Sequence, residues 1–209
     1  MKGRQLLTGV AIAALLLLAG AFWIAQHGKR APALSTSVQY LADGKPLPAF
    51  RLESTEGMLT NENLRGHWTF LLFGYTHCPD VCPTSLSLLA HVTDQLQQRM
   101  KEPPQVIFVS LDAPRDTLEV LRRYVPAFHR GFIGATGTDE ALKPFSKDLG
   151  LYYVRNVEEG KGQEGGGYSV DHTSSIFLIA PDTRLQAVFQ VPMEARQMAS
   201  DASAVIAAR

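Results

Sequence analysis

The chain has 209 residues, of which 45% are hydrophobic and 19% charged, the balance of an ordinary globular protein. Its 20 basic and 20 acidic residues cancel at pH 7, so charge gives no basis for binding nucleic acid. The two cysteines are too few to staple a disulfide-rich miniprotein.

The N-terminus contains an uncharged apolar run over residues 6–25. This run has the length of about 20 residues that a helix needs to cross a bilayer core. We therefore predict a membrane anchor in residues 1–27, with the domain outside the cytoplasm. A cleaved signal peptide is the alternative, because Ala-Gly-Ala at residues 19–21 fits a cleavage site.

The segment after the anchor, residues 28–45, has little apolar periodicity and carries proline, serine and threonine. Such a composition indicates a tether. The globular domain is then expected over residues 46–209.

The first half of this domain alternates between predicted strands and helices. The continuous apolar run at residues 69–75 is typical of a strand buried on both faces. Apolar residues then recur at helical spacing over residues 83–100. The following predicted elements are a strand at 106–111, a helix at 116–124, a strand at 132–135 and a helix at 139–149. Asp116 is placed to cap the helix at 116–124 or to favour its N-terminus by its charge.

The second half is predicted to consist of two hairpins and a closing helix. The first hairpin pairs residues 151–157 with 168–170 around a glycine-rich, flexible loop at 158–167. The other elements are a hairpin of residues 175–180 and 185–191, with a turn at 181–184, and a helix at 193–207. This order predicts an α/β, thioredoxin-like fold: a central mixed sheet flanked by helices, preceded by a transmembrane helix.

Cys78 and Cys82 lie between a predicted strand and helix. Pro83 is expected at the first helical position, which places Cys82 near the N-cap, where the helix dipole favours a thiolate. Three intervening residues give the sulfur atoms a wider reach than a Cys-x-x-Cys pair has. That spacing suits metal chelation and still permits a redox-active disulfide. Two soft thiolates select Cu(I) or Zn(II).

A histidine is the natural third ligand, and His172 is the best placed of the six. It starts an apolar strand whose beginning should face the cysteine loop in a thioredoxin-like sheet. Position alone leaves two interpretations, a metal ligand or a capping or packing histidine. Asp171 is then either a partner that orients His172 or a turn residue. His77 adjoins Cys78, but adjacent residues often point apart.

Three segments resemble the Sco/SenC family, and the resemblance covers about residues 46–208. They are Phe-Gly-Tyr-Thr-His-Cys-Pro-Asp-Val-Cys-Pro at 73–83, Val-Ser-Leu-Asp at 109–112 with Arg-Asp-Thr at 115–117, and Val-Asp-His-Thr at 170–173. The resemblance implies a thioredoxin-like fold that binds copper through Cys78, Cys82 and His172. It also implies copper delivery to the dinuclear CuA centre of cytochrome c oxidase.

One segment departs from the family pattern. Residues 112–116 read Asp-Ala-Pro-Arg-Asp, where the family often has Asp-Pro-Glu-Arg-Asp. We expect a loop away from the ligands there.

Two functions of different classes follow from these residues. A copper chaperone, which is not an enzyme, needs two thiolates and a histidine. Its expected partners are the copper-bearing subunit of cytochrome c oxidase and other periplasmic copper chaperones, with the domain on the periplasmic side of a bacterial inner membrane. A membrane-anchored thiol–disulfide oxidoreductase that reduces the cysteines of the copper acceptor needs only Cys78 and Cys82. Under that interpretation His172 is structural.

Overall fold

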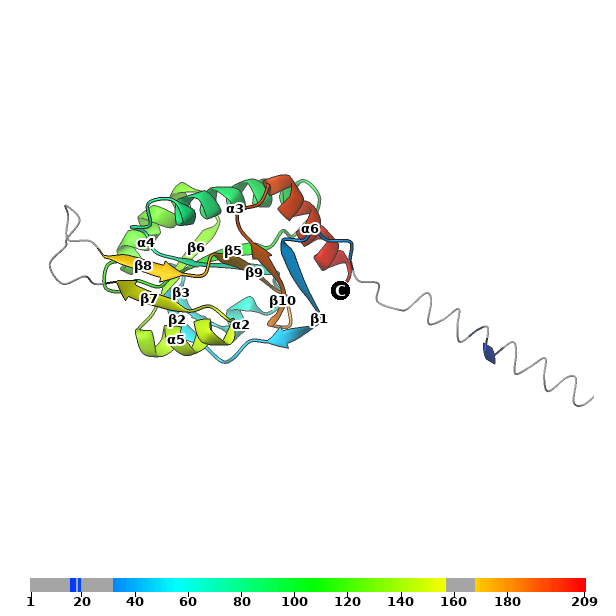
Figure 1. The fold of residues 1–209 in the computed structure, drawn as a ribbon, viewed down its shortest axis with the longest axis horizontal. Coiled ribbons are helices and arrows are strands. Elements are labelled where there is room, and N and C mark those ends of the chain that lie inside the picture. The colour runs from blue at the N-terminus through cyan, green and yellow to red at the C-terminus, as the bar shows by residue number, and fades with distance from the viewer. Residues whose placement is uncertain (1–15, 18, 20–31, 157–167) are drawn as a thin grey trace, which may run out of the picture.

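The computed structural model describes residues 16, 17, 19, 32–156 and 168–209. Its main body is an eight-stranded sheet with the strand order β1-β10-β9-β4-β5-β6-β2-β3 (Figure 1). These strands are β1 (Val38–Pro46), β2 (Arg51–Ser54), β3 (Gly57–Thr60), β4 (Thr69–Gly74), β5 (Gln105–Ser110), β6 (Phe132–Thr136), β9 (Ser175–Ile179) and β10 (Arg184–Gln190). A separate two-stranded sheet consists of β7 (Tyr153–Asn156) and β8 (Ser169–His172).

The centre of the main sheet is parallel and its flanks are antiparallel. Strand β5 runs parallel to both β4 and β6, whereas β9 is antiparallel to β4 and to β10. Every residue of β4 is buried, as expected for a central strand that is covered on both faces. The predicted mixed sheet, with early parallel crossovers and a late hairpin, is confirmed.

Helices cover both faces of the sheet. They are α2 (Asn61–Leu64), α3 (Val81–Gln97), α4 (Leu118–Tyr124), α5 (Asp139–Asp148), α6 (Ala195–Ala207) and the short 3-10 turn η1 (Val125–Ala127). Figure 1 shows α3 and α6 together on one side of the sheet, with α5 and α2 on the other. Each face buries its own apolar cluster, so the domain has two core layers with the sheet between them.

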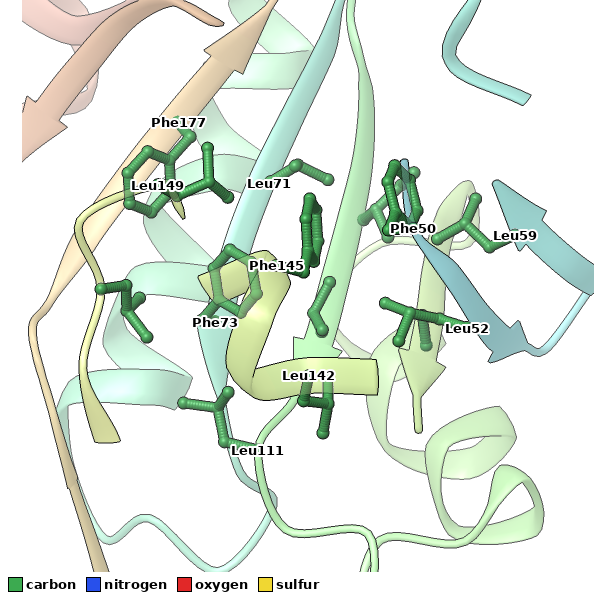
Figure 2. Packing of buried hydrophobic residues seen from close by; sticks show 14 of the residues in the cluster. Phe50, Leu52, Leu59, Leu71, Phe73, Leu111, Leu142, Phe145, Leu149 and Phe177 are labelled. Carbon is green, nitrogen blue, oxygen red and sulfur yellow. The ribbon is translucent and has the colours of Figure 1, made fainter. Parts of the chain in front are cut away.

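Helix α5 packs its apolar side chains into the hydrophobic core on its side of the sheet (Figure 2). The Phe145 ring stacks on Phe50 with centroids 4.3 Å apart and lies 5.7 Å from the ring of Phe73 in β4. Leu142 and Phe145 are three residues apart, so both side chains leave the same face of the helix and both are buried. The helix predicted at residues 139–149 is confirmed.

Strand β1 corrects the predicted boundary between tether and domain. Residues 38–45, which we placed in the tether, pair with β10 at the edge of the sheet. The sequence pattern of these residues does not indicate a strand, because the pairing register shifts between Tyr40 and Lys45 around Gly44, which has φ +62°. The alternation of apolar and polar residues that identifies a strand is therefore missing.

Two helix starts also differ from the prediction. Helix α3 begins at Val81 with Asp80 at the N-cap position, so Cys82 lies inside the first turn and Pro83 one residue further. Helix α4 is capped by Thr117, whose side chain accepts from the Val120 amide, and not by Asp116. Proline tolerates any position in the first turn, because the amides there have no helical partner, so it marks the start only approximately.

The N-terminal anchor prediction falls mostly on residues that the structure does not describe. Only residues 16, 17 and 19 of the predicted span are described, and they are helical. Within the described residues, no helix combines the length and hydropathy needed to span a bilayer. The predicted glycine-rich loop at 158–167 also lies outside them.

Candidate metal site

The cysteine loop joins the end of β4 to the start of α3. The Cys78 amide donates to the Tyr75 carbonyl at 3.3 Å, and the Cys82 amide donates to Cys78 Sγ at 3.4 Å. Both cysteines are free thiols; Cys78 is half-buried and Cys82 is buried. The loop therefore presents one thiol near the surface and one beneath it.

Gly74 gives the inner thiol its space. A Cβ atom on Gly74 would lie 2.7 Å from Cys82 Sγ and 2.9 Å from the Phe108 ring. Both distances are too short for a side chain, so Cys82 occupies the volume that any other residue at position 74 would take.

His172 meets this loop from the far part of the sequence. Its Nε2 atom lies 3.8 Å from Cys82 Sγ, although the two residues are 90 positions apart. Its Nδ1 atom lies 3.0 Å from the Thr173 carbonyl oxygen, which can only accept, so Nδ1 carries the proton. The lone pair of Nε2 therefore faces the thiol. We predicted that His172 starts the strand that is now β9, but it is the last residue of β8. Its side chain nevertheless lies beside the cysteine loop, as expected.

Burial favours the neutral form of both inner groups. It lowers the pKa of His172, against the opposing effects of the Thr173 carbonyl and the Asp171 charge. It raises the pKa of the Cys82 thiol, and the neighbouring Cys78 sulfur adds to this effect. Burial therefore opposes the thiolate that we expected at Cys82 in the metal-free protein, because it disfavours the charged form.

Two neighbouring residues do not take the roles of direct partners. Asp171 is exposed, and its carboxylate accepts from the Asn156 side chain at 2.7 Å, so it acts on His172 through its charge. His77 is exposed, and its Nδ1 lies 3.1 Å from the Thr76 hydroxyl, while its salt-bridge contact is with Asp116 at 3.8 Å. Neither residue contacts a cysteine sulfur among the described hydrogen bonds.

The three candidate ligands are not gathered as tightly as a bound metal requires. Among the described residues, no group of three or more His, Cys, Asp and Glu side chains is close enough to hold a metal ion as it stands. Of the three candidate ligands, His172 and Cys82 contact each other directly, through Nε2 and Sγ. The donor chemistry, two thiols and a neutral imidazole, nevertheless fits a soft cation.

Sequence reasoning missed the segment at 112–116, which we expected to be a loop away from the ligands. Asp112 and Asp116 are both fully buried. Asp116 accepts from the amide of Thr76, which precedes the cysteines, at 2.8 Å, and Asp112 accepts from the hydroxyl of Tyr168 near the start of β8. Both carboxylates thus contact segments that carry candidate ligands. Aspartates that follow a strand are usually solvated, so no pattern in the sequence indicated that these two are buried.

The fold and the site together define a thioredoxin-like α/β domain that carries a dithiol at the end of a core strand and a histidine opposite it. A sequence profile of the SCO1/SenC family matches residues 41–207. The chain belongs to the SCO1/SenC family.

Relatives and solved structures agree with this assignment. The SCO2-like protein RP587 of Rickettsia prowazekii is 33% identical over 150 residues, which cover 71% of each chain. Copper-bound ScoI of Arabidopsis thaliana superposes with a TM-score of 0.72 at 29% identity, covering 78% of this chain and 98% of that one. Apo Sco1 of Thermus thermophilus gives 0.69 at 34% identity, covering 83% and 97%. Matches to mitochondrial homologues from Arabidopsis thaliana, Bos taurus and Danio rerio span only 36%, 44% and 46% of those proteins.

Proposed function

We propose that this chain binds copper through Cys78, Cys82 and His172 and delivers it to the CuA centre of cytochrome c oxidase. The observation that carries the proposal is the contact of 3.8 Å between His172 Nε2 and Cys82 Sγ, with the free Cys78 thiol on the same loop. Two soft thiolates and an imidazole form a donor set that Cu(I) prefers. The copper bound in the related Arabidopsis thaliana structure supports the same cargo.

The different burial of the two thiols suits a carrier rather than a permanent metal centre. Metal binding displaces the thiol protons, and burial makes the Cys82 proton the harder one to remove. Cys78 is half-buried, so an acceptor's donor atom can reach the metal from its side. The ligands can then be exchanged one at a time, without releasing free copper.

The binding part of the proposal is tested by anaerobic titration of the reduced full-length protein with Cu(I) against a competing chelator. We expect one copper per chain, and His172→Ala should weaken the affinity by about tenfold or more. His67→Ala is the matched control, because His67 is exposed. Equal affinities for His172→Ala and the wild type would refute the ligand set.

The proposed place of action is the periplasmic side of a bacterial inner membrane, where residues 1–27 anchor a single-pass protein. The uncharged run of residues 6–25 supports this proposal. Periplasmic copper chaperones would supply the metal, and the copper-bearing oxidase subunit would receive it. The full-length chain should stay in the membrane fraction after a high-salt wash. Its release by salt would contradict the anchor.

A thiol–disulfide oxidoreductase is the second candidate, favoured by the free cysteine pair on one short loop. In that reaction a disulfide of the copper acceptor gains two electrons and two protons to become two thiols. Cys78 and Cys82 supply both as they form their own disulfide. A cell that carries His172→Ala separates the candidates. Failure to load oxidase with copper supports the carrier, whereas normal loading, together with failure of Cys78→Ser, supports the oxidoreductase.

A further inference from the structure

The hairpin that carries His172 is not part of the main sheet. Strands β7 and β8 pair with each other, and in the described part of the chain neither pairs with any of the eight other strands. Main-chain hydrogen bonds therefore do not fix His172 relative to the cysteine loop. Val170, Tyr153 and Tyr168 pack against the core, and polar side-chain contacts add to the attachment of the hairpin.

A fully buried carboxylate, that of Asp112, receives some of these contacts. Asp112 accepts from the Tyr168 hydroxyl beside β8, and its Oδ1 atom lies 3.7 Å from Nε of Arg155 in β7. Arg155 also donates to the Leu111 carbonyl at 2.7 Å. Asp112 is fully buried, so its carboxylate depends on the Tyr168 hydroxyl and on the guanidinium groups of Arg115 and Arg155.

Arg115 connects the two parts of the site. Its guanidinium pairs with Asp112 and stacks on the Tyr168 ring at 3.7 Å, and it donates to the Tyr168 carbonyl at 2.9 Å. The same guanidinium lies 5.9 Å from the centroid of Tyr75, the residue whose carbonyl accepts from the Cys78 amide. Tyr75 in turn meets the His172 ring edge to face, with centroids 6.4 Å apart.

The second carboxylate of the segment at residues 112–116, that of Asp116, binds the loop that carries the cysteines. Asp116 accepts from the amide of Thr76 at 2.8 Å and from its hydroxyl at 2.5 Å, and from the Ser110 hydroxyl at 2.6 Å. Its own amide donates to the Asp112 carbonyl at 2.8 Å, which closes residues 112–116 into one tight turn. This turn therefore contacts both segments that carry candidate ligands: Asp116 contacts the cysteine loop, and Asp112 contacts the β7–β8 hairpin.

We propose that the turn at residues 112–116 positions His172 against the two thiols, with Asp112 and Arg115 as positioning residues that act through Tyr168. The inference rests on the proposed function, because it matters only if His172 is a ligand. A short turn held by buried charge sets the separation of the two segments more narrowly than the hairpin alone would. His172 is then held beside Cys82, so metal binding requires a local adjustment of the ligands and not the ordering of the whole hairpin.

The test is a double-mutant cycle on the reduced full-length protein. Tyr168→Phe removes the hydroxyl that binds Asp112 and keeps the ring under Arg115, so it is the mildest change to the contact. We expect it to weaken Cu(I) affinity by about tenfold in the wild type, and to have no further effect in a His172→Ala background. Tyr152→Phe is the control, because Tyr152 is exposed just before the same hairpin.

X-ray absorption of the copper-loaded protein adds a readout that lost stability alone would not change. Scattering from a coordinated imidazole should decrease in Tyr168→Phe and persist in Tyr152→Phe. Asp112→Asn should give the same result more strongly, with thermal unfolding as the check that it folds. If it does not fold, Tyr168→Phe alone decides the question.

The outcomes separate the inference from the function on which it rests. Unchanged affinity in Tyr168→Phe, or an equal loss with and without His172, would overturn the positioning role and leave the copper site intact. If His172→Ala itself binds copper as tightly as the wild type, the proposed ligand set fails, and the positioning role fails with it.

Discussion

Gly74 shows how a single residue shapes the interior of the site. The absence of its side chain leaves room for Cys82 Sγ, which a Cβ would approach to 2.7 Å. Gly74→Ala should therefore displace the thiol or the Phe108 ring. We expect a loss of about 1–3 kcal/mol in unfolding free energy, measured by urea titration, together with weaker Cu(I) binding. Gly131→Ala is the control, since its Cβ would meet only the His129 ring, at 3.3 Å. Equal effects of both substitutions would contradict this steric account.

The lowered pKa of His172 predicts a pH dependence of stability in the metal-free protein. The unfolded chain takes up this proton near the ordinary value, whereas the buried imidazole takes it up only at lower pH. Between the two values the unfolded state holds more protons, so the free energy of unfolding falls as pH falls through that window.

This dependence can be measured with the reduced protein. The urea midpoint should decrease between pH 7 and about pH 5.5, and the decrease should be smaller for His172→Gln. His67→Gln keeps the imidazole at position 172 and should behave as the wild type does. If His172→Gln loses as much stability as the wild type, the pH dependence arises elsewhere.

Among the elements, those with a regular apolar pattern could be predicted from sequence and those at the sheet edges could not. Strand β4 is buried along its whole length, and its continuous apolar run identified it. Strand β1 is half exposed and its register is interrupted, so nothing in its sequence distinguished it from a tether. The short β2 and β3 have only four residues each, too few to show a period.

The β7–β8 hairpin has a second attachment, to helix α5. Asp139 in the first turn of α5 accepts from the Tyr153 hydroxyl at 3.0 Å and from Arg155 at 2.9 Å. The hydrogen bond from Arg155 is the main reason that the pKa of Asp139 is lowered to about 2, helped by Lys143 and Tyr153. The carboxylate is partly exposed, at 30%, so solvent screening limits the strength of this attachment.

Asp139→Asn should therefore loosen the hairpin more than it destabilises the domain. We expect a loss of about 1 kcal/mol in unfolding free energy, and faster amide exchange in β7 and β8. The wild type should lose the same contribution as pH falls from about 4 towards 2, because the folded carboxylate stays ionised longer than the unfolded one. Glu119→Gln, which breaks an exposed pair with Arg123, is the control. Unchanged exchange in both strands would show that Asp139 does not hold the hairpin.

For the whole molecule, the order of elements predicted the layers but not the contacts between distant segments. Alternating strands and helices implied a sheet covered on both faces, and the structure has it. Cys78 and Cys82 were singled out from local sequence, and His172 from its place in the implied fold together with the resemblance of residues 170–173 to the Sco/SenC family. The polar connection through Asp112 was missed, because a buried carboxylate and its partners Arg155 and Tyr168 share no local pattern in the sequence.

The N-terminal boundary of the domain gives a prediction at the scale of the whole fold. Residues before β2 belong to the folded unit: Ser35 donates from its hydroxyl to the buried Asp201 of α6 at 2.6 Å, and from its amide at 3.3 Å. Strand β1 also pairs with β10 and covers that edge of the main sheet.

A chain that begins at residue 32 should therefore unfold cooperatively, whereas one that begins at residue 47 should be much less stable. The shorter chain loses both Ser35 hydrogen bonds to Asp201, and it exposes the unpaired main-chain groups of β10, which can then pair with another molecule. Urea unfolding measures the first effect, and light scattering at increasing concentration measures the second. Ser35→Ala in the longer chain removes only the hydroxyl contact, so it should lower stability without promoting association. If the chain from residue 47 matches the longer one in both measurements, residues 32–46 are a tether after all, and β1 adds nothing to the fold.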